Sequence, residues 1–160
     1  MNGKLLIIRG IPGAGKTTAA KALIDVGAYD VFYEADQFFE FFGEYKFDAS
    51  KLGTAHNTCR ISVRNALAEG KRVIVSNTFT TWKEIVDYLK LAEAYGASVQ
   101  ILELQTNFGS IHDVPEDKIE QMRERFLNED GFNAFYESYF GKPFPEGYYV
   151  IHSTPVDYAY

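Results

Sequence analysis

One loop constrains the fold of this chain more than any other feature. Residues 4–18 read KLLIIRGIPGAGKTT, in which Gly10, Gly15, Lys16 and Thr17 occupy the fixed places of the pattern G-x-x-x-x-G-K-[ST]. An apolar run typical of a buried strand precedes the loop, and helix-forming residues follow it. In this context the glycines let backbone N–H groups surround phosphate oxygens. The alternative is a glycine-rich turn that binds nothing, and the complete pattern between strand and helix argues against it.

The motif assigns a role to each residue of this loop. Lys16 is expected to reach the β- and γ-phosphates, and the Thr17 hydroxyl is expected to bind a metal ion at the start of the next helix. The predicted cofactors are therefore ATP and Mg²⁺. The nucleotide is expected to contact the whole loop, which comprises Gly10, Pro12, Gly13, Ala14, Gly15, Lys16, Thr17 and Thr18.

Strands alternate with helices along the rest of the chain. The residue patterns predict strands at 5–8, 31–35, 72–76, 98–104 and 148–152, and helices at 18–26, 37–42, 48–69, 82–95, 114–126 and 132–140. Asp48 is expected to cap the long third helix, and Thr81 with Glu84 forms a capping box for the fourth. We expect residues 1–160 to form one α/β domain, a three-layer P-loop NTPase or kinase fold with a mostly parallel central sheet.

Composition limits the kinds of binding partner and the cellular compartment that we expect for this protein. The net charge is −6, so no global positive field attracts nucleic acid, and any contact with a polynucleotide must be local. Cys59 is the only cysteine, which excludes an intrachain disulfide and suits a reducing cytosol. The first apolar run is too short for a signal peptide or a membrane span. We therefore expect a cytoplasmic protein without membrane contacts.

Asp36 is the first candidate for chemistry outside the loop. It follows the predicted strand at 31–35, and α/β sheets build their sites at the carboxyl ends of their strands. A carboxylate there can accept the proton of an attacking hydroxyl during phosphoryl transfer. Asp36 could instead cap the short helix at 37–42, and the two roles are compatible.

Several segments together resemble a known family, the small P-loop kinases of the polynucleotide-kinase type. They are GIPGAGKTT, EADQFF, YKFDASKLGTAHNTC, VIVSNT and VPEDKIEQMRERF, spread over residues 4–126. The most specific part is the pattern Tyr45, Phe47, Asp48, Leu52, Ala55, His56 and Cys59. The family includes the kinase domain of phage polynucleotide kinase and phage and bacterial proteins labelled AAA family ATPases. The resemblance implies ATP-dependent phosphorylation of a hydroxyl group, most often on nucleic acid, with Asp36 as general base.

Two positions depart from the pattern of these relatives. The strand at 72–76 ends in Ser76-Asn77-Thr78, where the relatives carry an aspartate. Mg²⁺ would then be bound by Thr17, the phosphates and water, and Asn77 would only polarise or position neighbouring groups. Phe39 stands where the phage enzyme has an arginine that reads an acceptor phosphate, so the acceptor is expected to be held differently.

The acceptor side is expected to comprise Asp36, Phe39, His56, Arg60, Asn77 and Thr78. His56 and Arg60 lie one turn apart on a predicted helix and could contact the acceptor, although a lone helical histidine is more often structural. Phe39 belongs to the aromatic run Phe38, Phe39, Phe41 and Phe42, on which a base could stack. The alternative is that most of these rings line the core.

Two arginines could complete the site from a lid at about residues 105–130. Arg123 and Arg125 would close over the transferring phosphoryl group and neutralise its charge. The alternative is a solvated helix face on which Glu120 pairs with Arg123.

We therefore predict a P-loop phosphotransferase whose acceptor is an alcohol group. Two nucleic-acid acceptors fit the resemblance. One is the 5′-hydroxyl end of DNA or RNA. The other is a hydroxymethyl group on a pyrimidine base, as in phage 5-hydroxymethyluridine DNA kinases, which would place the protein in the host cytoplasm and in DNA modification. A small-molecule or nucleotide kinase and a nucleotide-binding regulatory ATPase module remain alternatives, and the oligomeric state stays open.

Overall fold

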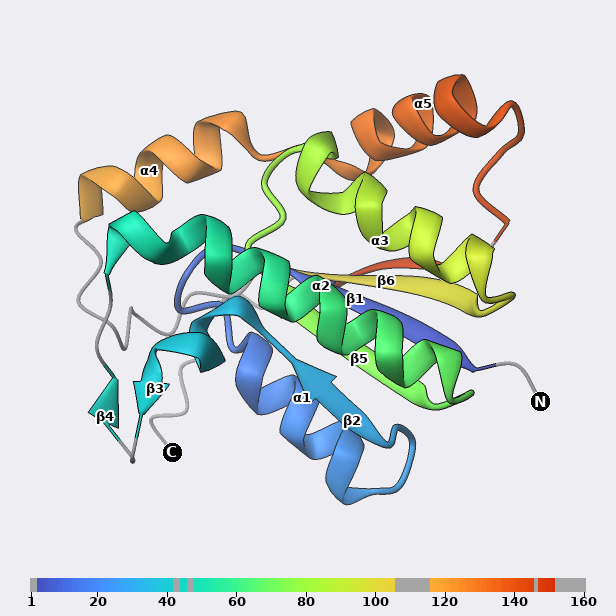
Figure 1. The fold of residues 1–160 in the computed structure, drawn as a ribbon. Coiled ribbons are helices and arrows are strands. Elements are labelled where there is room, and N and C mark those ends of the chain that lie inside the picture. The colour runs from blue at the N-terminus through green and yellow to red at the C-terminus, as the bar shows by residue number, and fades with distance from the viewer. Residues whose placement is uncertain (1–2, 42–43, 46–47, 106–115, 146, 152–160) are drawn as a thin grey trace, which may run out of the picture.

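A five-stranded parallel sheet forms the centre of the computed structural model, which describes residues 3–41, 44–45, 48–105, 116–145 and 147–151 (Figure 1). Its strand order is β2-β5-β1-β6-β7, and all four pairings are parallel. The strands are β1 (Lys4–Arg9), β2 (Val31–Tyr33), β5 (Arg72–Asn77), β6 (Ser98–Leu104) and β7 (Tyr148–Ile151). The predicted α/β fold with a mostly parallel sheet is therefore confirmed.

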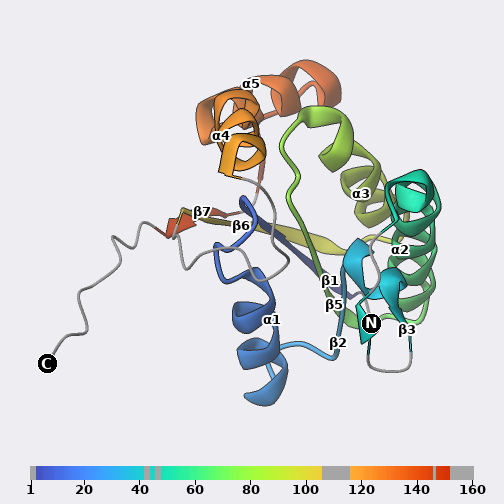
Figure 2. The same ribbon diagram turned by 90° about the vertical axis from the view of Figure 1, so that its left-hand side faces the viewer.

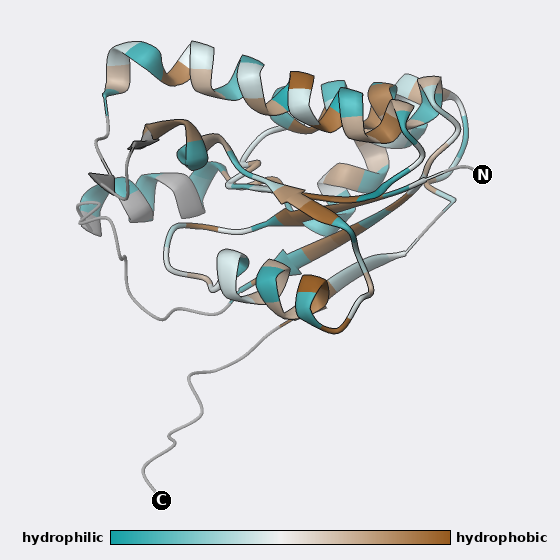
Figure 3. Ribbon diagram, turned by 60° about the horizontal axis from the view of Figure 1, so that its bottom comes forward, coloured by the Kyte–Doolittle hydropathy of each residue, from teal (hydrophilic) through white to brown (hydrophobic). Residues whose placement is uncertain are grey.

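Helices cover both faces of the sheet and give it three layers. α1 (Lys16–Asp25) lies on one face, whereas α2 (Leu52–Ala68), α3 (Trp82–Ala94) and α5 (Glu129–Phe140) lie on the other (Figures 1 and 2). Both faces are buried, so β1 and β5 consist mainly of apolar residues, and Figure 3 shows brown stretches of ribbon within the sheet. Alternate residues enter different cores: Leu6 and Ile8 pack with Ala20 of α1, and Leu5 and Ile7 pack toward α2, α3 and α5.

The parallel order places the carboxyl ends of all five strands at one edge. β1 leads there into the phosphate loop at residues 10–15, and β2 leads into a short 3-10 helix, η1 (Ala35–Phe39). α4 (Glu116–Arg125) lies over the same edge, above the start of α1 in both views (Figures 1 and 2). The edge therefore collects the phosphate loop, the Asp36 segment and α4.

The prediction for residues 37–42 was wrong. Instead of a helix, these residues form the end of η1 and then β3 (Glu40–Phe41), which pairs antiparallel with β4 (Glu44–Tyr45). Aromatic residues are weak helix formers, and burial of Phe39 against α2 decides the local path.

The starts of the helices also differ from the predicted ones. α1 begins at Lys16, and Asp48 caps a separate 3-10 turn, η2 (Ala49–Lys51), before α2 starts. α5 begins three residues early because Asn128 caps it, with its Oδ1 accepting from the N–H of Gly131 at 2.8 Å. The capping box of Thr81 and Glu84 is confirmed. Phe42, Phe47 and the polar stretch at 106–115 lie outside the described residues.

No helix within the described ranges is both long and apolar enough to cross a membrane.

Candidate active site

The phosphate loop has the backbone that its glycines predict. A Cβ on Gly10 would lie 2.8 Å from the carbonyl oxygen of Leu104, so no larger residue fits there. Gly13 and Gly15 have φ angles of 85° and 88°, in the left-handed region that favours glycine. Ala14 is buried against the α1 core and anchors the loop between them. α1 then starts at Lys16 with no acidic residue in its first turn, which favours an anion at its N-terminus.

Lys16 closes the loop in this structure. Its Nζ donates to the carbonyl oxygens of Gly10 and Ile11, at 2.8 and 3.0 Å. Burial lowers the pKa of Lys16 to about 8, against the opposing effect of the carboxylates of Glu34 and Asp36. A bound phosphate would favour the charged ammonium. The side chain is therefore placed to exchange two carbonyl oxygens for phosphate oxygens.

Thr17 contacts a carboxylate that the sequence reasoning missed. Its Oγ1 donates to Oε2 of Glu34 at 3.0 Å. Glu34 directly follows β2, and both it and Asp36 lie close enough to Lys16 to affect its pKa. The signal was present, because Glu34 stands two residues before Asp36 at the end of the same strand. Pro12 is partly buried in the loop, and Thr18 is exposed on α1.

Asn77 and Thr78 connect the end of β5 to both parts of the site. Oδ1 of Asn77 accepts from the N–H of Ala35 at 2.8 Å, and its Nδ2 lies 3.9 Å from Sγ of Cys59. The carbonyl oxygen of Thr78 accepts from the N–H of Gly10 at 3.3 Å. Asn77 therefore holds Ala35, the residue between Glu34 and Asp36.

Phe39 has a core position. Its ring is 1% exposed, packs with Ala35 and Ala55, and meets the ring of Phe38 edge-on at 5.4 Å between centroids. This burial argues against the predicted contact between Phe39 and an acceptor. The physical reason is that η1 turns the ring inward onto α2. Phe38 is only partly buried.

The remaining predicted residues lie on two helices. His56 and Arg60 are partly buried on α2, where Nη2 of Arg60 lies 3.4 Å from Oδ1 of Asn57. Arg125 is exposed at the last position of α4. Arg123 also belongs to α4, but its side chain lies outside the described residues, so its predicted pairing with Glu120 stays a prediction.

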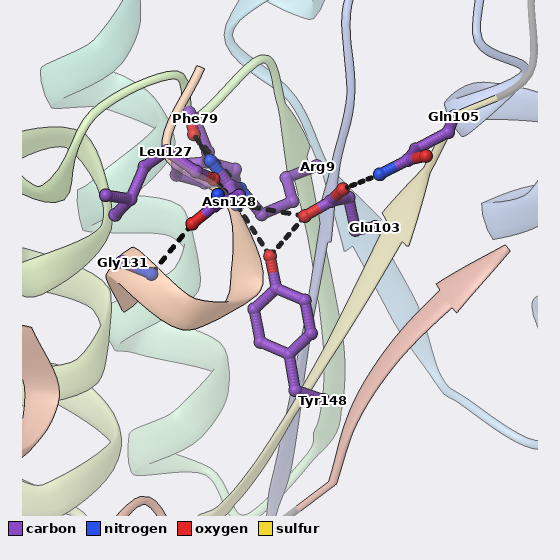
Figure 4. Close-up of polar contacts among 8 residues, drawn as sticks. All are labelled: Arg9, Phe79, Glu103, Gln105, Leu127, Asn128, Gly131 and Tyr148. Carbon is purple, nitrogen blue, oxygen red and sulfur yellow. Dashed lines mark hydrogen bonds and ion pairs between the residues drawn. The ribbon is translucent and has the colours of Figure 1, made fainter. Parts of the chain in front are cut away.

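A buried arginine that the sequence reasoning missed lies directly before the loop. Arg9 ends β1 with 0% exposure (Figure 4). Its Nε and Nη2 donate to the carbonyl oxygen of Phe79 at 3.1 and 2.6 Å. Its Nη1 reaches Oε1 of Glu103 at 3.3 Å, the hydroxyl of Tyr148 at 2.6 Å and the carbonyl oxygen of Leu127 at 2.5 Å. The sequence offered one indication of this buried arginine, because a charged residue stands at the end of the apolar run LLII.

Arg9 and its partners Phe79, Glu103, Leu127 and Tyr148, here called the Arg9 cluster, hold the C-terminal end of α4. Leu127 follows α4, and its N–H donates to the carbonyl oxygen of Thr80 at 2.7 Å. The Phe126 ring lies 3.9 Å from Cζ of Arg9. Because Arg9 and Gly10 are consecutive, the C-terminal end of α4 is held one residue away from the phosphate loop.

The donor set at this edge suits a hard cation shared with a nucleotide. Hydroxyl and carboxylate oxygens are the ligands that Mg²⁺ prefers. Across the described ranges, no three His, Cys, Asp or Glu side chains gather into a group that could hold a metal by themselves. A cation here would therefore also need phosphate oxygens, as in sites where Mg²⁺ is bound through few carboxylates plus substrate.

Comparison with known proteins identifies the family of this chain. A family model described as "AAA domain" matches residues 5–112. The human protein NEDD4-binding protein 2 is 28% identical over 132 residues, which cover 76% of this chain and 8% of that protein. The chain thus spans a small part of that relative.

Solved structures share the fold. Chaetomium thermophilum Kti12 in complex with ADP-AlF3 is 12% identical, with a TM-score of 0.63 over 92% of this chain and 88% of that one. A chain of the Pnkp1/Rnl/Hen1 RNA repair complex is 19% identical, with a TM-score of 0.55 over 89% of this chain and 47% of that one. The Mycobacterium tuberculosis APS kinase CysC in complex with AMPPNP and APS is 13% identical, with a TM-score of 0.52 over 96% and 91% of the two chains. At these identities the likeness shows a P-loop NTPase or kinase fold.

Proposed function

The chain belongs to the AAA domain family, and on that basis we propose that it is a kinase that transfers the γ-phosphate of ATP to a hydroxyl group. One observation carries the proposal: Lys16 and Thr17 of the phosphate loop face two carboxylates, Glu34 and Asp36, at the end of β2. A phosphate-binding lysine beside a carboxylate that can act as general base is what phosphoryl transfer to an alcohol requires. In this proposal residues 1–160 act as one kinase domain in the cytoplasm.

Each residue of the site has a role in the proposed reaction. Lys16 binds the β- and γ-phosphates, and the backbone N–H groups of the loop and of the α1 N-terminus hold the remaining phosphate oxygens. Asp36 accepts the proton of the acceptor hydroxyl as its oxygen attacks the γ-phosphorus in line. Thr17 would hold Mg²⁺, which when bound neutralises phosphate charge. Arg125, with Arg123, would neutralise the negative charge of the transferring group from α4.

A nucleic-acid hydroxyl is the acceptor class that we favour. The acceptor would be a 5′-hydroxyl end of DNA or RNA, or a hydroxymethyl group on a pyrimidine base in phage DNA. A fold shared with a chain of an RNA repair complex supports this choice, as does the sequence resemblance to polynucleotide kinases. The net charge of −6 is compatible with it, because a site for one or two nucleotides needs few phosphate contacts.

A small-molecule kinase is the second candidate. The APS kinase shares this fold over nearly the whole chain, and the acidic net charge favours small acceptors over long polynucleotides. A regulatory ATPase module is the third. A kinase should consume ATP much faster when its acceptor is present, whereas a regulatory module should not.

The decisive experiment uses γ-labelled ATP and a panel of acceptors. The panel contains 5′-hydroxyl oligonucleotides, DNA with hydroxymethylated bases, nucleosides, nucleotides and adenosine phosphosulfate. Asp36→Asn is expected to lower transfer by about 10²–10⁴-fold and to leave ATP affinity within a few-fold, because it removes the base and keeps the shape. Normal transfer by this variant would show that the base lies elsewhere, and the absence of labelled product with every acceptor would favour the regulatory module.

A further inference from the structure

We propose that Glu34 is the protein carboxylate that binds the divalent cation accompanying the nucleotide, and that Asn77 positions it. The inference deepens the proposed function and rests on the nucleotide-binding half of it. It concerns an acid from the end of β2, whereas the end of β5 carries no acid, since Ser76 and Asn77 stand there.

The sheet register places Glu34 and Ser76 together on the face covered by α1. Phe32 pairs with Ile74 and Tyr33 with Val75 along β2 and β5, so the next residues in register are Glu34 and Ser76. Phe32 and Ile74 pack in the core cluster that contains Ala20 of α1. Because side chains alternate along a strand, Glu34 and Ser76 point toward that same face. This is the face on which Thr17 contacts Glu34.

Ser76 gives an independent sign that this place is incomplete without a ligand. The residue is 1% exposed, and within the described part of the chain its Oγ has no hydrogen-bond partner. A buried hydroxyl is normally paired, and an unpaired one calls for a missing water or ligand. Because Ser76 follows Val75 as Glu34 follows Tyr33, and both belong to the α1 face, its hydroxyl is a further candidate oxygen for the proposed cation site.

The contact between Thr17 and Glu34 has the spacing of two metal ligands. Oγ1 of Thr17 and Oε2 of Glu34 are 3.0 Å apart. Octahedral Mg²⁺ with oxygen ligands at about 2.1 Å brings adjacent ligand oxygens to about 2.9–3.0 Å from each other. The two oxygens therefore need little movement to bind one cation.

Asn77 has a different task. Strand alternation turns it to the opposite face, where its Nδ2 lies 3.9 Å from Sγ of Cys59 on α2. Its Oδ1 accepts from the N–H of Ala35 at 2.8 Å, and Ala35 lies between Glu34 and Asp36. Asn77 is therefore a positioning residue: one side-chain amide holds the backbone that carries both carboxylates, and its oxygen is already in use.

The test measures ADP affinity by titration calorimetry with and without Mg²⁺. For the wild type, we expect Mg²⁺ to tighten ADP binding by about ten-fold or more. Glu34→Gln keeps an acceptor oxygen for Thr17 but removes the charge, and should reduce this ratio to below about three-fold. Without Mg²⁺ the same variant should bind ADP at least as tightly as the wild type, because a negative charge beside the phosphates has been removed. A merely structural glutamate would instead weaken ADP binding in both conditions.

Asp36→Asn is the matched control. It removes the same charge two residues away, and its Mg²⁺ ratio should stay within about three-fold of the wild type. Asn77→Ala should lower the ratio, because the N–H of Ala35 loses its acceptor and Glu34 is no longer held in position. An unchanged ratio in Glu34→Gln, with a native circular dichroism spectrum, overturns the inference. Failure of the wild type to bind ADP would overturn the proposed function itself, so the two failures are distinguishable.

Discussion

Nη1 of Arg9 lies 3.3 Å from Oε1 of Glu103, and the two side chains are only 0% and 2% exposed. The hydroxyl of Tyr148 joins the pair, since it accepts from Nη1 of Arg9 and donates to Oε1 of Glu103 (Figure 4). Burial raises the pKa of Tyr148, so the phenol remains protonated as this donor. The buried charges are therefore paired and hydrogen-bonded, which is the condition for tolerating them in a core.

Breaking this pair should destabilise the protein strongly. Arg9→Met leaves Glu103 buried without its cation and is expected to lower the free energy of unfolding by about 3–5 kcal/mol. Tyr148→Phe removes one donor and should cost about 1–3 kcal/mol. The double variant Arg9→Met with Glu103→Met should be less destabilised than Arg9→Met alone. Urea unfolding of the variants measures all three quantities.

The exposed pair of Arg72 and Asp30 provides the control for that prediction. Its closest atoms are 2.8 Å apart, but the side chains are 41% and 40% exposed, so water screens the interaction. Asp30→Asn should leave the unfolding midpoint almost unchanged. Equal effects of Asp30→Asn and Arg9→Met would contradict the role assigned to the buried cluster.

Lys16 should make nucleotide binding sensitive to alkaline pH. Its pKa is about 8 in the structure, and bound phosphates would raise it, so binding takes up a proton once Lys16 has lost its own. Below that pKa the affinity for ADP should be flat, and above it the affinity should fall by up to about ten-fold per pH unit. Calorimetry in buffers of different ionisation enthalpy measures the proton uptake. Lys16→Met should bind ADP weakly and abolish this slope; a slope that persists there would assign the titration to another group.

The α4 arginines should act on the rate of transfer. A cation that closes over the transferring phosphoryl group stabilises the transition state more than the ground state, so its loss appears in kcat. At least one of Arg123→Ala and Arg125→Ala is expected to lower kcat by about ten-fold, or about 1.4 kcal/mol. The KM for ATP should change less. Steady-state kinetics that show neither kcat altered beyond about two-fold would identify α4 as an amphipathic cover.

Phe39 should contribute to stability. Replacing this 1% exposed ring by alanine is expected to cost about 3–5 kcal/mol, because a cavity would remain between η1 and α2. Phe135→Ala is the exposed counterpart, at 48% exposure, and should cost far less. Thermal unfolding compares the two. If a Phe39→Ala variant unfolds like the wild type but has a raised KM for a nucleic-acid acceptor, the prediction that a base stacks on Phe39 would be supported instead.

The sequence by itself determined the features that arise from residues close together in the chain. The phosphate loop could be predicted because its residues 10–17 form one local structure, and its glycines adopt backbone angles that side chains disfavour. The capping box of Thr81 and Glu84 spans four residues and could equally be predicted from the sequence. Apolar runs separated by amphipathic segments predicted the parallel sheet between helices.

Only the tertiary structure decided how distant residues meet. Thr17 contacts Glu34 because β2 ends beside α1, and Asn77 reaches Ala35 because β2 and β5 are neighbours in the order β2-β5-β1-β6-β7. Arg9 bonds to Leu127 across 118 positions. Local propensity and periodicity carry no information on strand order or register, and these contacts depend on both. The same reason explains Phe39, whose burial follows from packing against α2 and could not be read from its neighbours in the chain.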